Sequence, residues 1–455
     1  MKLLRLAAVP ALVCVCQTMA AAQPLTLTLD EALVRAREQA PSVLVARARI
    51  EEARGRLAGA RIRHRDNPTL DIGAWPRSTD TGRLMDVDIG LSQVFETGGQ
   101  RAARIAGAEA GIRRDDAAAA EAMRLAMRDV AIAFVRLLHA QERLALLRDA
   151  EGMAGEVLTV AQRRYAAGDI AVLDVNVARS TVARARAARL AAEAERVEAA
   201  GLLRRLLGLG LGHGPGLGPE ARQGLAPASA SPGQRDGPPA QPGGLMVQGG
   251  GLASQSGERG LTLVARGALR VSPRGDLAAL AAAIENRPDL QALRADIGDA
   301  EAEAQLGRAM SRPDIGIGAR YKHEEGHRAV LGEVTLTLPV FSRGQEQQAT
   351  GSARAARLRI ELDAARAAAL SDVESAYATS VARQAAVSAF EQEALPGLDE
   401  NERLARRSFD VGQISLPELL LIRRELLDTR LDYLDRLLDA SEAVITQDAL
   451  AGVLR

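Results

Sequence analysis

The sequence repeats its most distinctive segments once, about 245 residues further along the chain. Residues 68–73 (PTLDIG) correspond to 313–318 (PDIGIG), and 94–100 (VFETGGQ) correspond to 340–345 (VFSRGQ). Two further pairs keep the same order and nearly the same spacing. They are Ala40-Pro41 with Arg287-Pro288, and 163–168 with 406–412. A period this long indicates duplication of a domain-sized unit rather than a solenoid repeat. We therefore predict a first repeat over 23–208 and a second over 276–455.

The N-terminus is typical of a protein exported from the cytoplasm. A basic start, a short apolar run from Leu6 to Val15 and small residues at 20–22 predict a signal peptide over 1–22. Both cysteines of the chain, Cys14 and Cys16, fall inside it, which excludes disulfides and thiolate metal sites from the mature protein. Each follows a valine, which argues against lipidation. Since 58 basic residues balance 58 acidic ones, nothing indicates nucleic-acid binding.

Long helices dominate both predicted repeats. Residues 101–165 and 345–395 contain no proline, and a helix of the first length would be ~100 Å long. Apolar residues recur at three- and four-residue spacing, which predicts coiled-coil packing. One seam comprises Val130, Phe134, Leu137 and Leu144, and the other Leu420, Leu427, Leu431, Leu434, Leu438 and Ile445. Helices of this length must pack on equally long partners, so we infer a helical barrel or bundle of several copies.

Four short stretches alternate between apolar and polar residues. They are 69–75, 85–95, 314–321 and 330–340, for example Met85, Val87 and Ile89 opposing Asp86 and Asp88. A half-buried soluble sheet has the same period. An exported barrel that meets lipid outside and water inside also needs it, and the signal peptide and long helices favour the barrel. Four aromatic residues near the predicted strand ends suit an interfacial girdle: Trp75, Phe95, Tyr321 and Phe341.

The stretch 209–275 differs in composition from both repeats. It is rich in Gly and Pro, and we predict an inter-repeat linker, most of it without regular structure. Residues 261–271 are predicted to return as a short strand, before the second repeat begins near Gly275.

Two corresponding turns interrupt the helical pattern. Arg164, Tyr165 and Gly168 define the first, and Arg407, Phe409 and Gly412 define the second. Glycine permits the positive φ of a helix C-cap, and Asp169 or Ser415 could begin the next helix. The simplest interpretation is a helix-to-helix turn. Because the pattern recurs at equivalent positions, we also predict a shared role in docking a partner.

Enzyme chemistry finds little support in the sequence, which has no phosphate-binding loop and no nucleophile elbow. The one cluster of potential metal ligands is His323, Glu324, Glu325 and His327. It falls in a predicted hairpin loop, 322–329, and not on a helix as metalloprotease chemistry requires. The cluster could hold a divalent cation weakly, or it could be a solvated polar loop. We predict no enzyme activity and no cofactor.

Together these segments resemble the TolC-type outer-membrane efflux proteins. Residues 92–101 and 163–170 resemble signatures of the heavy-metal branch, the CzcC type. The resemblance implies a mostly α fold with a small β-barrel, in which a homotrimer closes twelve strands and continues as a periplasmic helical tunnel. It also implies a position in the outer membrane and two partners, a periplasmic adaptor (membrane fusion protein) and an inner-membrane pump of the RND type. By the same resemblance, Glu418 lies at the tunnel's constriction, with Asp174 as its first-repeat counterpart.

The predicted function is a passive exit duct of a tripartite efflux system, with divalent heavy-metal cations as the expected substrate. Drugs, or a polypeptide secreted by a type I system, are the alternative substrates. A soluble periplasmic coiled-coil scaffold is an alternative from another class. It would account for the helices but not for the alternating strands.

Overall fold

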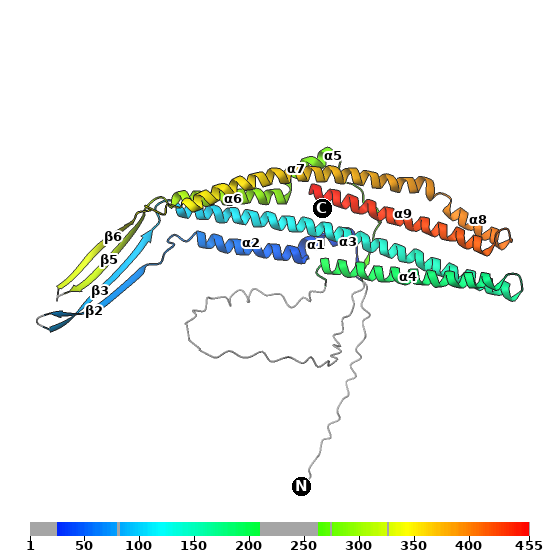
Figure 1. Ribbon diagram of the computed structural model, residues 1–455, viewed down its shortest axis with the longest axis horizontal. Coiled ribbons are helices and arrows are strands. Elements are labelled where there is room, and N and C mark those ends of the chain that lie inside the picture. Colours follow the sequence, from blue (N-terminus) through cyan, green and yellow to red (C-terminus); the bar gives the residue numbers. More distant parts are fainter. Residues whose placement is uncertain (1–24, 80–81, 210–262, 274, 325–326, 455) are drawn as a thin grey trace, which may run out of the picture.

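The protein is described here by a computed structural model, which covers residues 25–79, 82–209, 263–273, 275–324 and 327–454. The predicted signal peptide and most of the predicted linker, 210–262 and 274, lie outside these residues. The molecule is elongated, with a small sheet at one end and two helical turns at the other (Figure 1). One turn joins α3 (Gln100–Ala166) to α4 (Val172–Leu206), and the other joins α8 (Leu398–Asp410) to α9 (Leu416–Ala451).

The sheet has four antiparallel strands in the order β2-β3-β5-β6. They are β2 (Thr69–Thr79), β3 (Gly82–Phe95), β5 (Asp314–Glu324) and β6 (His327–Thr337). All four predicted strands are therefore confirmed. The predicted hairpin loop 322–329 is wrong, because β5 continues to Glu324 and β6 already begins at His327. Charged and polar side chains at these positions suggested a loop, but they occupy paired strand positions instead.

The described residues also form nine α-helices, and two short irregular helices lie between them. In the first half the α-helices are α1 (Leu29–Gln39), α2 (Pro41–Ala60), α3 (Gln100–Ala166) and α4 (Val172–Leu206). In the second half they are α5 (Leu277–Ala283), α6 (Pro288–Ala309), α7 (Gln345–Ala389), α8 (Leu398–Asp410) and α9 (Leu416–Ala451). The irregular helices are the 3-10 turn η2 (Ile284–Asn286) and the π-helical turn η3 (Phe390–Ala394), so the predicted run 345–395 is not one continuous α-helix. Over the residues described, no helix is both long and apolar enough to cross a bilayer.

The two predicted seams lie at helix interfaces. α3 runs nearly the length of the helical region and packs on α2 and α6 toward the sheet and on α4 and α9 toward the turns. Val130, Phe134, Leu137 and Leu144 are all buried, as is Ile445 at the end of the second seam. The rest of the second seam is partly buried and packs on the same clusters. Both predicted seams therefore lie in contacts between helices of one chain.

A two-stranded parallel sheet lies at the middle of the molecule. Its strands are β1 (Leu25–Leu27) and β4 (Leu263–Ala265), which pair in register. The strand predicted within 261–271 is thus present but short. Leu27, Leu263 and Ala265 join the largest buried cluster, together with α1, α3 and the ends of α4 and α9. The segments on either side of the undescribed linker are therefore anchored in the common core.

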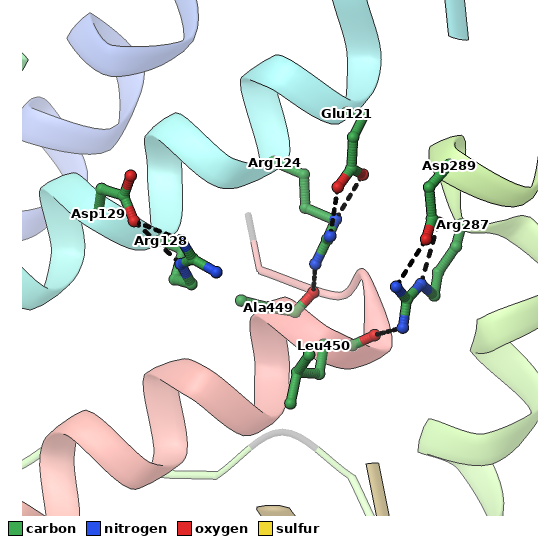
Figure 2. A network of polar contacts seen from close by, with 8 residues as sticks. All are labelled: Glu121, Arg124, Arg128, Asp129, Arg287, Asp289, Ala449 and Leu450. Carbon is green, nitrogen blue, oxygen red and sulfur yellow. Dashed lines mark hydrogen bonds and ion pairs between the residues drawn. The ribbon is translucent and has the colours of Figure 1, made fainter. Parts of the chain in front are cut away.

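The C-terminal end of α9 is held by one arginine from each half of the chain (Figure 2). Arg124 on α3 donates to the Ala449 carbonyl oxygen at 2.5 Å and also pairs with Glu121. Arg287, at the N-cap position of α6, donates to the Leu450 carbonyl oxygen at 3.2 Å and pairs with Asp289. The last carbonyls of a helix have no partners within it and carry partial negative charge, so both guanidinium groups complement them. This contact joins the two halves at the middle of the molecule.

Candidate functional site at the two ends of the molecule

One face of the sheet is apolar and open. Large apolar side chains alternate along all four strands on this face, and most of them are between 37% and 78% exposed. They include Leu70, Ile72, Met85, Ile89, Leu91, Ile315, Ile317, Val330, Val334 and Leu336. A continuous exposed apolar surface of this kind marks a contact with lipid or with another protein.

The opposite face carries a belt of ion pairs that spans the strands. Arg77 on β2 pairs with Asp86 on β3 at 2.7 Å and with Glu324 on β5. Arg320 on β5 bridges Asp88 on β3 at 3.2 Å and Glu333 on β6 at 3.3 Å. Asp86 is almost fully buried, so its carboxylate needs this partner. We name these residues, with Lys322, the charge belt.

The expected aromatic girdle required Trp75 to lie near a strand end, but it does not. β2 continues to Thr79, and Trp75 points to the polar face. A Cβ placed on Gly73 would lie 3.1 Å from its ring, so the two residues share that face. Phe95 does end β3 and packs edge-on against His64, whereas Phe341 follows the end of β6 and is 92% exposed.

The segment 96–101 joins the sheet to α3 and contacts both repeats. Glu96 pairs with Arg104 through both carboxylate oxygens, and the Thr97 hydroxyl donates to the Pro313 carbonyl. Gln100 is buried and donates to the Asp314 carboxylate at 2.9 Å. Gly98 lies so close to α6 that a Cβ there would be 2.2 Å from the Ala309 carbonyl oxygen. The motif thus fixes how the strands meet the helices.

At the other end, the two predicted turns have the expected geometry. Gly168 has φ +85° and Gly412 has φ +78°, and the turns close with equivalent backbone hydrogen bonds. The Asp169 amide donates to the Arg164 carbonyl, and the Gln413 amide donates to the Ser408 carbonyl. This is the glycine C-cap predicted for both turns.

The two turns also touch each other, which the sequence did not predict. The Arg164 guanidinium lies over the Phe409 ring at 4.5 Å from its centroid, and Phe409 is buried. Tyr165 of the first turn is the repeat equivalent of Phe409 in the second turn. Unlike Phe409, it is half exposed. Four more exposed apolar side chains lie in the two turns or near the starts of α4 and α9: Val172, Leu173, Val411 and Leu421. We name Tyr165 and these four residues the tip surface.

Ser415 begins α9, as predicted, but Asp169 does not begin α4. The N-cap position of α4 is Ala171, whose backbone amide donates to the Asp174 carboxylate at 3.3 Å. Asp174 thus supplies an acceptor for the Ala171 backbone amide, while the alanine side chain itself caps nothing.

Glu418 occupies the same position in α9 as Asp174 does in α4. The Ser415 amide and hydroxyl both donate to its carboxylate, at 2.7 and 2.8 Å. These hydrogen bonds, chiefly the one from the Ser415 backbone, lower the pKa of the exposed Glu418 carboxyl below its ordinary value. Both gate candidates therefore lie at the third position of a helix and accept from the N-cap amide, but only Glu418 belongs to a full capping box, with Ser415.

The metal-binding interpretation of the hairpin tip gains no support from the geometry. His323 lies on β5 and His327 on β6, and Glu324 is directly opposite His327. His323 alternates with Glu324 and so faces the other side of the sheet. Glu325 lies outside the described residues. Within the described ranges, no three His, Cys, Asp or Glu side chains gather as a metal site would require.

Sequence reasoning missed the charge belt, the contacts of Thr97 and Gln100, and the Arg164–Phe409 stack. The alternation of Asp86, Asp88, Arg320 and Lys322 with apolar residues was a visible signal that charge lines one face. Which acid pairs with which base depends on strand register, and that required the structure.

Comparison with known proteins agrees with this geometry. The family described as outer membrane efflux protein matches residues 32–209 and 279–453. The cobalt-zinc-cadmium resistance protein CzcC of Cupriavidus metallidurans is 25% identical over 448 residues, which cover 94% of this chain and 90% of CzcC. This similarity agrees with the predicted heavy-metal branch.

Solved structures share the fold at lower identity. A membrane protein from Pseudomonas aeruginosa has a TM-score of 0.66 at 20% identity, covering 93% of this chain and 92% of its own. CusC has the same TM-score at 15% identity, covering 93% and 91%. The Campylobacter jejuni outer membrane channel CmeC has a TM-score of 0.68 at 12% identity, covering 93% and 85%. By the two matched stretches, which include most of both repeats, the chain belongs to the outer membrane efflux protein family.

Proposed function

We propose that this protein is the outer-membrane exit duct of a tripartite efflux system and works as a homotrimer. The sheet would span the outer membrane, and the helices would extend into the periplasm as a tunnel. The duct itself would be passive, so an inner-membrane pump of the RND type would supply the energy through a periplasmic adaptor.

The observation that carries this proposal is a sheet that has one apolar face, one charged face and two open edges. The apolar face suits lipid, and the charge belt suits a water-filled interior. β2 and β6 each have one strand partner among the described residues, so their outer edges present unpaired backbone groups. A four-stranded sheet is too small to close, whereas twelve strands from three chains lie within the range of known barrels.

The tip surface is the proposed contact with the adaptor. Tyr165, Val172, Leu173, Val411 and Leu421 are exposed and apolar at the end that faces away from the sheet. Gly168 and Gly412 shape the two turns. Arg164 and Phe409 contact each other, so their part in docking would be to hold the two turns together. Arg407 is exposed.

Asp174 and Glu418 are the proposed gate residues. Each lies in the first turn of a helix, next to a glycine turn, and three copies would bring their carboxylates around one axis. A ring of carboxylates attracts cations. Leu421 occupies the next family position for an acidic residue and is exposed, so a second carboxylate ring is not part of the proposal.

Divalent heavy-metal cations are the proposed substrate, supported by the similarity to CzcC. The test is a deletion strain exposed to a panel of cobalt, zinc, cadmium, drugs and detergents. We expect lower tolerance of the divalent metals alone, restored by the intact gene supplied on a plasmid.

Two outcomes would change the proposal. Sensitivity to drugs with normal metal tolerance would assign the duct to drug efflux. Normal tolerance throughout, together with loss of one secreted polypeptide from the medium, would assign it to protein secretion.

A further inference from the structure

The two halves of one chain meet along a seam whose register is known. In the sheet, β3 of the first half pairs antiparallel with β5 of the second. Along this seam Asp88 lies opposite Lys322, Gly90 opposite Arg320 and Leu91 opposite Ala319. The Asp88 carboxylate lies 3.8 Å from the Lys322 ammonium group.

The two hairpins are built on the same internal register. Gly73 pairs with Asp88 in the first hairpin, and Gly318 pairs with Glu333 in the second. Each residue of the second pair follows its counterpart by 245 positions. β5 is therefore the equivalent of β2, and β6 is the equivalent of β3, residue for residue. The open edge of β6 should then recognise a strand of the kind that pairs with the equivalent edge of β3, which is the edge facing β5.

We propose that the seam between neighbouring copies of this chain repeats the seam within it, so that β6 of one copy pairs antiparallel with β2 of the next and Glu333 lies opposite Arg77. This inference rests on the proposed oligomeric duct and adds the partner surface and its register. Applied along the strands, the same correspondence places Leu336 opposite Ala74 and Thr335 opposite Trp75.

Two properties favour this register: the pairing of opposite charges, and the face of the sheet on which each side chain lies. Arg77 and Glu333 belong to the charge belt, so an acid meets a base on the polar face, as Asp88 meets Lys322. A shift by one residue would turn every side chain of one strand to the wrong face. A shift by two would put Glu333 opposite Trp75 or Thr79 and lose the charge match. The charge belt would thus continue from copy to copy.

Disulfide trapping in outer membranes from cells that make the full chain tests the register. The double variant Leu336→Cys with Ala74→Cys places the two thiols opposite each other across the proposed seam. In the matched control, Leu336→Cys with Ile72→Cys, the partner is displaced by two residues along the same face. Within one copy, β2 and β6 are separated by two strands, or roughly 14 Å. Disulfides need Cα atoms within about 7 Å, so a bridge can form only between copies.

We expect a covalent ladder of multimers on oxidation of the first variant, with at least tenfold less from the control and none from the unsubstituted chain. A second pair on the polar face, Thr335→Cys with Trp75→Cys, should also cross-link and guards against local misfolding. Cross-linking of the control in preference to both proposed pairs would overturn the register. If all variants remain oligomeric and conduct ions but no proposed pair cross-links, the inference fails while the proposed duct stands. A chain that is monomeric in the membrane would overturn both.

Discussion

At the scale of single residues, Glu418 shows how a structural role and a functional role can overlap. Its carboxylate completes the capping box that begins α9, accepting from the Ser415 amide and hydroxyl. The same carboxylate is the proposed gate charge. Any substitution at Glu418 therefore changes the helix start as well as the charge, and a test of the gate must separate them.

We predict that Glu418→Ala lowers the block of single-channel current by divalent cations, because it removes the ring of carboxylates. Ser415→Ala is the matched control. It weakens the same cap, by about 1 kcal/mol for a serine N-cap, but keeps the carboxylate. Recordings in planar bilayers should show reduced block for Glu418→Ala and near-normal block for Ser415→Ala. Equal effects from both variants would mean that the helix start matters and the charge does not, and Asp174→Ala would be the next variant to measure.

The capping role itself depends on pH. Hydrogen bonds from Ser415 lower the pKa of Glu418 below the ordinary value of about 4.5. A carboxyl with a lowered folded-state pKa contributes its full stabilisation above its unfolded-state pKa and loses it as pH falls through the folded-state value.

We therefore expect the first turn of α9 to lose hydrogen-exchange protection as pH drops below about 4.5, after correction for intrinsic exchange rates. Glu418→Gln, which cannot ionise, should show no such change at this turn. Protection that falls equally in both proteins would mean that another group controls the turn.

At the scale of elements, backbone conformation and not space restricts which residues can replace the glycines of the two turns. A Cβ at Gly168 or Gly412 would meet nothing within 4 Å, yet φ is +85° and +78°. A β-branched residue there should cost roughly 1–3 kcal/mol of strain.

We predict that Gly168→Val with Gly412→Val lowers export, because the tip surface is distorted, while the oligomer still reaches the outer membrane. Gly152→Val is the control, since it lies in α3 with equally open surroundings and ordinary helical φ. Metal tolerance and membrane fractionation would be measured together. Normal tolerance in the double variant would exclude a docking role for the turns.

At the junction between the sheet and the helices, lack of space restricts which residues can replace the glycines. A Cβ at Gly98 would lie 2.2 Å from the Ala309 carbonyl oxygen, and one at Gly307 would lie 2.4 Å from the Gln348 amide nitrogen. Overpacking of this kind typically costs 1–3 kcal/mol or more. We predict that Gly98→Ala lowers the heat resistance of the purified oligomer on gels. Gly111→Ala, at a helical site with nothing within 4 Å, should leave it unchanged; equal losses in both would refute the close contact.

Sequence periodicity identified the elements well and their ends less well. Alternation revealed all four strands because one face is apolar throughout. It missed the continuation through Lys322, His323 and Glu324, since three consecutive polar residues break the alternation and look like a loop. Asp169 looked like the better helix cap, yet Asp174 supplies the acceptor from inside α4. The Arg164–Phe409 contact joins turns more than 240 residues apart, so no local pattern could have predicted it.

At the scale of the whole molecule, duplication gives one chain two equivalent hairpins and two equivalent turns at opposite ends. The hairpins form a sheet with one apolar and one charged face, and its outer edges are left open. The helices lead from this sheet to the tip surface, where the two turns meet. An incomplete sheet at one end and a paired tip at the other suit a subunit of a ring better than an independent protein.

The measurement that tests this account most directly is the ionic current through the purified full-length protein in a planar lipid bilayer. We predict discrete, uniform conductance steps, because each inserted oligomer forms one water-filled duct lined by the charge belt. Vesicle flotation of the same preparation would establish that the protein is in the membrane. Membrane-bound protein that produces no steps, at any voltage or with either gate carboxylate replaced, would contradict the account.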